Sequence, residues 1–439
     1  MKVKLLLISF LFIQFAFSQN ITFSDSNFKL KLLSFDPNYP IGENLAGEFA
    51  PIDANNDKEI SFAEALNVSS LQIFGDEISN IQGLQYFTNL KTLRINTDFV
   101  QNINLSTLVN LERLFVGTMD LGQTSPNIGI LTSLDLSKNT KLNFLFIVTS
   151  TLSTLDLTKN VNLTELYVRQ EKNDFVLNIF NLVNLRKLTY TSAFNPNLDI
   201  STCTNLIDLE MSGSGFSSID VSNQSILSKL SIVSTNITSL NLSKNLSLEI
   251  VVIVNNRQLT SLNLGTIQYV TSLFVNDNNL TTLNTNNLPY LQFLDCSNNK
   301  LTEVFIKNTS FETYINLDNN ANLVTVCCDN VQIIPVRNIL NRSGQFNVTV
   351  TSNCDTAATL ELNSFRNNSE IILFPNPASK VISLKSNLKI DKIEIYDLNG
   401  RKLIETSRDI INIENIQSGF YFAKVFNQNN SQILKFLKE

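Results

Sequence analysis

The sequence predicts a mainly β solenoid with a curved parallel sheet, followed by a small antiparallel β-sandwich. The first observation is a leucine-rich unit that recurs with almost no drift from about Val68 to Phe311. The second is the length of the unit, since 21 or 22 residues leave no room for a regular helix on the convex side. The third is a change of pattern after residue 370, where predicted strands are separated by Asn-Gly and Ser-Gly turns.

The first segment has the pattern of a signal peptide. Lys2 and Lys4 precede an apolar stretch over residues 5–17, and Ala16-Phe17-Ser18 supplies small residues for cleavage. We therefore expect a signal peptide over residues 1–18 and a mature chain that begins near Gln19. No later stretch approaches the ~18 apolar residues that span a bilayer, so no transmembrane segment is expected after cleavage.

Composition excludes several classes of function. The formal net charge of −6 argues against nucleic acid as a partner, because nucleic-acid binding normally requires a basic surface. The chain contains no His, which excludes Ser-His and Cys-His catalysis and His-metal sites.

Residues 19–67 are predicted to cap the first repeat, because a solenoid would otherwise expose its core at the end. An apolar pattern from Phe23 to Leu33 predicts a short helix with Ser24 or Asp25 as N-cap.

An acidic loop within this cap resembles the EF-hand calcium loop over residues 53–64. Oxygen-bearing side chains occupy the positions at which such a loop holds a hard cation. The resemblance implies calcium as a cofactor, with side-chain ligands and one backbone ligand at Asp53, Asn55, Asp57, Glu64 and, through its backbone, Glu59. Lys58 stands where the family has Gly, and Pro51 interrupts the entering helix. The alternative is an acidic turn that opens a helix at Ser61.

The repeats are predicted over residues 68–326, each with two short extended segments. In one unit the apolar residues fall at Leu227, Leu230 and Ile232, and then at Ile237, Leu240 and Leu242. Buried amides at Asn256, Asn278 and Asn299 are expected to bond turn backbone just beyond the sheet. These units, with Ser-Lys-Asn or Thr-Lys-Asn at a second corner, resemble the bacterial leucine-rich-repeat family of surface proteins.

Because successive side chains of a strand point to opposite faces of the sheet, alternation predicts which side chains point away from the core. If Leu114 and Val116 point inward, the residues beside them must point to solvent. We predict a ligand-binding patch of aromatic and cationic side chains at Arg94, Arg113, Phe115, Phe144, Phe146, Tyr167 and Arg169, with Lys187 beside them. The alternatives are that the aromatic residues only pair across strands, or that the extension over residues 119–132 covers them.

Residues 327–356 are predicted to cap the last repeat. Cys327 or Cys328 is expected to form a disulfide with Cys354, because an exported chain meets oxidising conditions. The adjacent cysteines leave the choice of partner open.

Residues 357–370 have the polar composition of a linker, and residues 371–439 form the tail. Four tail segments, beginning at Phe374, Ile393, Ser418 and Lys435, resemble the C-terminal sorting domain of the type IX secretion system of Bacteroidetes. The resemblance implies the type IX machinery as a partner and delivery to the outer surface or the medium of a Gram-negative bacterium. It implies that the machinery reads Gly419, Tyr421, Lys435 and Lys438.

We therefore expect a non-enzymatic, adhesin-like protein that binds a protein or glycan on a cell or matrix surface through its concave sheet. The alternative is a structural component of a surface coat or matrix. A carbohydrate-active enzyme is the third hypothesis, with Asp208 and Glu210 as the carboxylates. An open sheet offers them no cleft that would raise either pKa.

Overall fold

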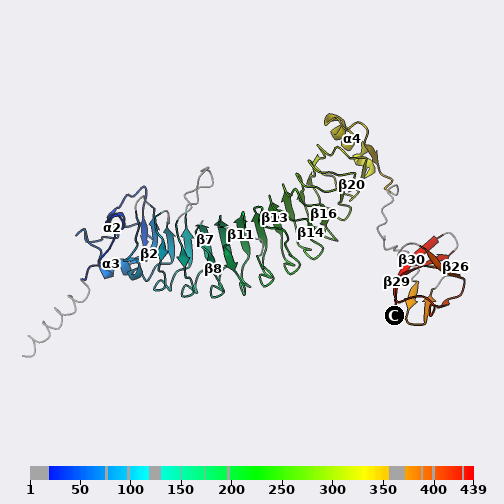
Figure 1. The fold of residues 1–439 in the computed structure, drawn as a ribbon. Coiled ribbons are helices and arrows are strands. Elements are labelled where there is room, and N and C mark those ends of the chain that lie inside the picture. Colours follow the sequence, from blue (N-terminus) through cyan, green and yellow to red (C-terminus); the bar gives the residue numbers. More distant parts are fainter. Residues whose placement is uncertain are drawn as a thin grey trace, which may run out of the picture. The chain divides into compact units, whose positions relative to one another are not determined.

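The computed structural model describes residues 19–74, 78–95, 99–117, 130–149, 151–172, 174–194, 198–354, 371–386, 389–397, 401–427 and 430–439. The chain separates into two compact units, residues 1–356 and residues 357–439 (Figure 1). The expected signal peptide lies outside the described residues. Among those described, no helix is both long and apolar enough to cross a membrane.

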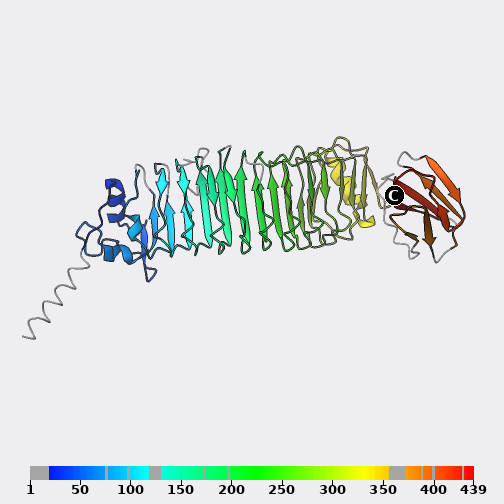
Figure 2. The ribbon, with the colours of Figure 1, turned by 60° about the horizontal axis from the view of Figure 1, so that its bottom comes forward.

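One long sheet runs the length of the first unit. Its strands are parallel and in register, except that the first runs antiparallel to the second (Figure 2). In order, they are β1 Gly42–Asn44, β2 Val68–Ile73, β3 Thr92–Ile95, β5 Arg113–Val116, β7 Phe144–Thr149, β9 Glu165–Gln170, β11 Lys187–Ser192, β12 Asp208–Ser212, β13 Lys229–Val233, β15 Ile250–Val254, β17 Ser272–Phe274, β19 Phe293–Asp295 and β21 Tyr314–Asn316.

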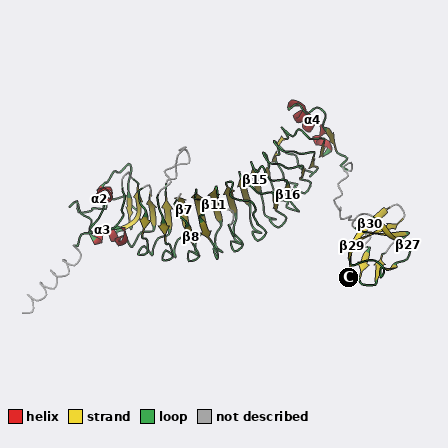
Figure 3. Ribbon diagram, in the orientation of Figure 1, coloured by secondary structure: helices red, strands yellow, loops and turns green. Residues whose placement is uncertain are grey.

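Shorter strands form the convex layer, and loops connect the two layers (Figure 3). They are β4 Asn102–Ile103 with β6 Ser133–Leu134, β8 Thr154–Asp156 with β10 Val176–Asn178, β14 Ser239–Asn241 with β16 Ser261–Asn263, and β18 Thr282–Asn284, β20 Glu303–Ile306, β22 Thr325–Cys328 and β23 Thr349–Thr351. The predicted mainly β solenoid is confirmed.

The repeated leucines account for the core. Leu114, Leu145, Leu166 and Leu188 stand side by side on successive strands, and each is fully buried. Burial of one such side chain contributes roughly 1.5–3 kcal/mol. Because every unit presents the same residue at the same height, the core continues from one repeat to the next.

Buried side-chain amides hold the turns beyond the long sheet. The Asn256 amide donates to the Ile232 carbonyl at 3.1 Å and accepts from the Thr235 N–H at 2.9 Å. Asn278 and Asn299 make the equivalent bonds one and two repeats later. This confirms the expected role of the recurring asparagines.

The second corner uses asparagine in the same way. Asn160 and Asn245 are fully buried, and each donates to two carbonyl groups of the preceding turn. Backbone groups that no strand can pair are thereby satisfied at both corners of the repeat.

Short helices stand at both ends of the first unit. They are α2 Ser26–Leu33, α3 Phe62–Leu66 and the 3₁₀ turn η1 Leu84–Tyr86 at the beginning, and η2 Asn330–Gln332 and α4 Ile333–Arg342 at the end. The Asp25 carboxylate caps α2 by accepting from Asn27 and Phe28 N–H, and its other oxygen accepts from Ser79 and Asn80. Asp25 therefore ties the first helix to the first repeat.

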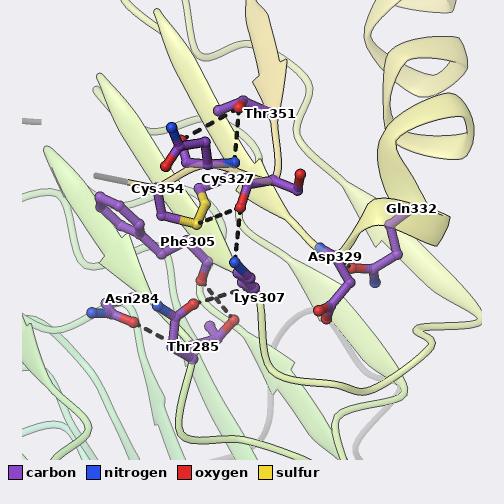
Figure 4. Close-up of a disulfide and its surroundings, with 12 residues drawn as sticks. Asn284, Thr285, Phe305, Lys307, Cys327, Asp329, Gln332, Thr351 and Cys354 are labelled. Atoms are coloured by element: carbon purple, nitrogen blue, oxygen red, sulfur yellow. Dashed lines mark hydrogen bonds between the residues drawn. A yellow bond between two sulfur atoms is a disulfide. The ribbon is translucent and has the colours of Figure 1, made fainter. Parts of the chain in front are cut away.

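A disulfide joins Cys327 of β22 to Cys354 after β23, so the structure selects Cys327 between the two adjacent candidates (Figure 4). Cys328 is a buried free thiol whose pKa is raised to about 11 by burial. Nearby, the buried carboxylate of Glu312 accepts hydrogen bonds from Asn308 and Gln332, which connects the segment before β21 to η2.

The second unit contains two small antiparallel sheets. One consists of β24 Ile372–Phe374, β25 Val381–Lys385 and β28 Ile410–Asn412; the other of β27 Lys402–Thr406, β26 Lys392–Tyr396, β29 Gly419–Asn427 and β30 Asn430–Lys438. Ile382, Ile393, Ile395 and Phe436 are fully buried in a core of their own. Alternation of these apolar residues with polar ones is what the sequence pattern predicted.

Candidate ligand-binding face

The outward residues of the long sheet form straight rows because the strands pair without slippage. In one row Arg94, Phe115, Phe146 and Tyr167 are neighbours on β3, β5, β7 and β9. Arg113 and Phe144 are neighbours in the adjacent row. Six of the predicted patch residues therefore come together on one face, which is the inner side of the curve (Figure 1).

The aromatic residues of this patch form one cluster. Ring centroids are 4.6 Å apart between Phe115 and Phe144, 5.4 Å between Phe144 and Tyr167, and 6.4 Å between Phe146 and Tyr167. Phe115 and Phe144 are only 4% and 7% exposed, although neither belongs to the interior core. The prediction that Phe115 and Phe144 are exposed to solvent is thus wrong: both rings leave the core, but they lie against each other and beneath arginine side chains.

Two arginines lie over these rings. The Arg94 guanidinium carbon is 3.8 Å from the centroid of Phe115, and that of Arg113 is 4.1 Å from the centroid of Phe144. A planar guanidinium stacks well on a ring and keeps its N–H groups at the edge. Burial, together with the charge of Arg113, lowers the pKa of Arg94. At Phe115 and Phe144 it is therefore the guanidinium groups rather than the buried rings that meet solvent, whereas Phe146 and Tyr167 are half-buried.

The other predicted cations are engaged in ion pairs. Arg169 lies 3.2 Å from Glu171, and Lys187 lies 3.3 Å from Asp208. Lys229 contacts Asp208 at 3.7 Å and also pairs with Glu210. Arg113, in contrast, forms no ion pair within the described part of the chain.

The sequence analysis did not predict these ion pairs. The pattern that indicates them is the alternation of negative and positive side chains at one outward position of successive strands, which holds Glu165, Lys187, Asp208 and Lys229. Opposite charges directly across a pair of strands stabilise a sheet by roughly 0.2–1 kcal/mol per pair.

The far end of the same face carries exposed apolar side chains. Ile250, Phe293 and Tyr314 are 37%, 41% and 45% exposed. A cleft of about 420 Å³ opens where Tyr314 and Asn316 of β21 face Arg342 of α4. The sequence did not indicate this cleft, because helix α4 was not predicted.

The acidic loop adopts a closed turn. The Asp53 carboxylate accepts from the N–H of Asp57 at 3.1 Å and of Lys58 at 2.9 Å, and Glu64 accepts from Ala54 and Ser61. Lys58 has a φ of 65°, the left-handed conformation for which the EF-hand uses Gly.

One feature of the loop matches the alternative of a helix-opening turn. Ser61 and Glu64 form a capping box at the start of α3. Within the described residues, no three Asp, Glu, His or Cys side chains are grouped closely enough to hold a metal ion. The donors are of the type calcium takes, so calcium binding by Asp53, Asn55, Asp57, Glu59 and Glu64 stays a prediction.

The predicted sorting residues lie on β29 and β30. Gly419 pairs with Lys438 across the two strands. The Tyr421 hydroxyl donates to the Gln417 carbonyl at 2.7 Å, and its ring packs on Phe436. The Lys435 ammonium lies 3.9 Å from the centroid of Phe420.

Residues 372–439 match the family model of the secretion system C-terminal sorting domain. The C-terminal unit is a secretion sorting domain. This domain marks proteins that the type IX system of Bacteroidetes delivers to the outer surface. The predicted localisation is thus confirmed.

Several solved structures are similar to this chain. The functional domain of InlJ from Listeria monocytogenes is 17% identical, covering 91% of this chain and 97% of its own, with a TM-score of 0.39. An internalin, InlF, from the same organism is 19% identical over 69% of this chain and 90% of its own, with a TM-score of 0.32. The leucine-rich repeat domain of APL1B is 14% identical over 75% of this chain and 91% of its own, with a TM-score of 0.34. Among curated proteins, none matches this chain in sequence.

Proposed function

We propose that this exported chain is a non-enzymatic, adhesin-like binding protein that recognises a protein or glycan through the concave face of its long sheet. The observation that carries the proposal is the aromatic cluster outside the core with two arginines stacked on it. Aromatic and arginine side chains dominate the energetics of recognition surfaces, because they gain large contact area for little conformational entropy. A rigid sheet holds them without the cost of ordering a loop.

The electrostatics of the face support binding rather than catalysis. A glycosidase mechanism would need one of the two carboxylates, Asp208 or Glu210, to stay protonated. Burial alone would raise the pKa of Glu210, but the hydrogen bond and charge of Lys229 hold that pKa below its usual value. A general acid requires the opposite shift, so Asp208 and Glu210 serve as ion-pair partners in this proposal.

The experiment is binding of the fluorescent mature chain to a glycan array and to an array of purified extracellular-matrix proteins. Phe146→Ala with Tyr167→Ala is the test variant, because both rings are only half-buried and outside the core. A matched control is Tyr269→Ala with Tyr290→Ala, a stacked and exposed pair away from the sheet face. The proposal expects array binding that only the first variant loses. Binding that neither variant changes would overturn it.

One observation favours the alternative of a surface-coat component. Ile250, Phe293 and Tyr314 leave an apolar area on the same face, and such areas are often covered in an assembly. Light scattering over a range of protein concentrations separates the two functions. Growth of the particle with concentration supports the coat, and a constant monomer mass supports the binding protein.

A further inference from the structure

We propose that the stacked arginines make the N-terminal part of the concave face a receptor for an acidic segment of a protein partner. This inference rests on the proposed function and names the ligand chemistry of the same site. The first observation is that Arg113 is exposed, while the ring of Phe144 beneath it is buried. The group that a ligand meets first is accordingly a guanidinium.

The charge of Arg113 is not balanced in the way that the charges on the neighbouring strands are. Among the described residues Arg113 forms no ion pair, whereas Arg169, Lys187 and Lys229 each contact a carboxylate. Arg94 and Arg113 stand on adjacent strands, and the charge of Arg113 lowers the pKa of Arg94, while the charge of Glu43 raises it. A bound carboxylate relieves this repulsion and accepts two N–H bonds from a guanidinium fork.

The stacking also prepares the site for binding. A free arginine loses considerable side-chain entropy when it is fixed, and stacking on Phe144 fixes Arg113 before the ligand arrives. The half-buried rings of Phe146 and Tyr167 lie next to the arginines and offer apolar contact to the same segment.

The rest of the face decides between a protein and a sulfated or carboxylated glycan. A uniformly negative polysaccharide that follows the sheet would next meet Glu165 and two lysines that are already paired with Asp208 and Glu210, so these strands would offer it no unpaired lysine. A protein surface can place its acidic residues against Arg94 and Arg113 only, and apolar residues against Phe293 and Tyr314 at the far end. The charge pattern consequently favours an acidic protein segment.

The test measures binding of three labelled probes to the mature chain by fluorescence anisotropy: an octaglutamate peptide, an octaglutamine peptide and a heparin octasaccharide. We expect octaglutamate to bind more tightly than the other two, with affinity that falls as salt is added. Arg113→Gln should weaken octaglutamate binding by about tenfold or more, as expected for loss of a charge-assisted contact. Arg113→Lys should recover only part of this loss because it lacks the stacked fork.

Arg257→Gln is the matched control, since Arg257 is exposed in a turn beyond the sheet. Tighter binding of heparin than of octaglutamate would overturn the inference in favour of an anionic glycan. It is also overturned if octaglutamate fails to bind, or binds Arg113→Gln equally well. If the array binding described above persists in any of these cases, the proposed function stands and only the anionic ligand is lost.

Discussion

Replacement of Asn256 by Ala tests how the repeats are held together. In the wild type the fully buried Asn256 amide satisfies the Thr235 N–H, the Thr235 hydroxyl and the Ile232 carbonyl. Ala removes these bonds and leaves at least one donor and one acceptor buried without partners. Each such group costs about 1–3 kcal/mol, so the free energy of unfolding should fall by about 2–6 kcal/mol.

The assay is urea unfolding followed by circular dichroism at 218 nm, a wavelength typical of β-structure, because the chain has no Trp to report by fluorescence. Asn287→Ala is the matched control, since Asn287 is exposed and donates one bond to the Gly265 carbonyl. The control should lose about 0.5–1.5 kcal/mol, the usual net contribution of one hydrogen bond. Equal losses for the two variants would refute the claim that buried amides hold the turns.

Three further predictions follow from single contacts. Lys229 lowers the pKa of Glu210, so this ion pair stabilises the fold above the ordinary pKa of glutamate, and the stabilisation is lost as pH falls through the lowered value. Between pH 5 and 3, the free energy of unfolding from urea titrations should therefore fall less for Glu210→Gln than for the wild type. Equal falls in the two proteins would count against the pair. Cys354→Ala opens a disulfide that closes a span of 27 residues and should lower the free energy of unfolding by about 3–4 kcal/mol, with no further loss on reduction of the variant; unchanged stability would contradict this. Calorimetry should show calcium binding to the mature chain that Asp53→Ala abolishes, and a flat wild-type trace dismisses the calcium loop.

The repeat architecture was predictable because one period fixes both the buried leucines and the strand register. Leu114 and Leu145 had to be neighbours once each unit was assigned one strand of the long sheet. The outward positions followed from alternation, and Arg94, Phe115, Phe146 and Tyr167 do lie in one row.

Exposure was not predictable from alternation alone. Whether an outward ring is covered depends on side-chain conformations, and here Arg94 turns back over Phe115. Pairing of Lys187 with Asp208 likewise depends on the geometry of adjacent strands rather than on either residue.

The ends of the array were the least predictable part of the first unit. Cys327 and Cys328 are equivalent in sequence, and only the direction in which β22 presents each side chain selects Cys327. Helix α4 follows the last repeat and does not share the repeat pattern. The periodicity of the sequence therefore predicted neither the helix nor the cleft beside Arg342.

The central claim is that the concave face of the sheet is the binding surface. Its most direct test is photo-crosslinking on the arrays, with a photoreactive residue placed at Ser231 on the sheet face or at Ser239 on the convex layer. Both positions are serines in strands of the same repeat, so the two labelled proteins differ only in which face of the solenoid carries the photoreactive group. The account predicts crosslinks to the bound array protein or glycan from position 231 and none from position 239. Crosslinks from position 239 alone would contradict it.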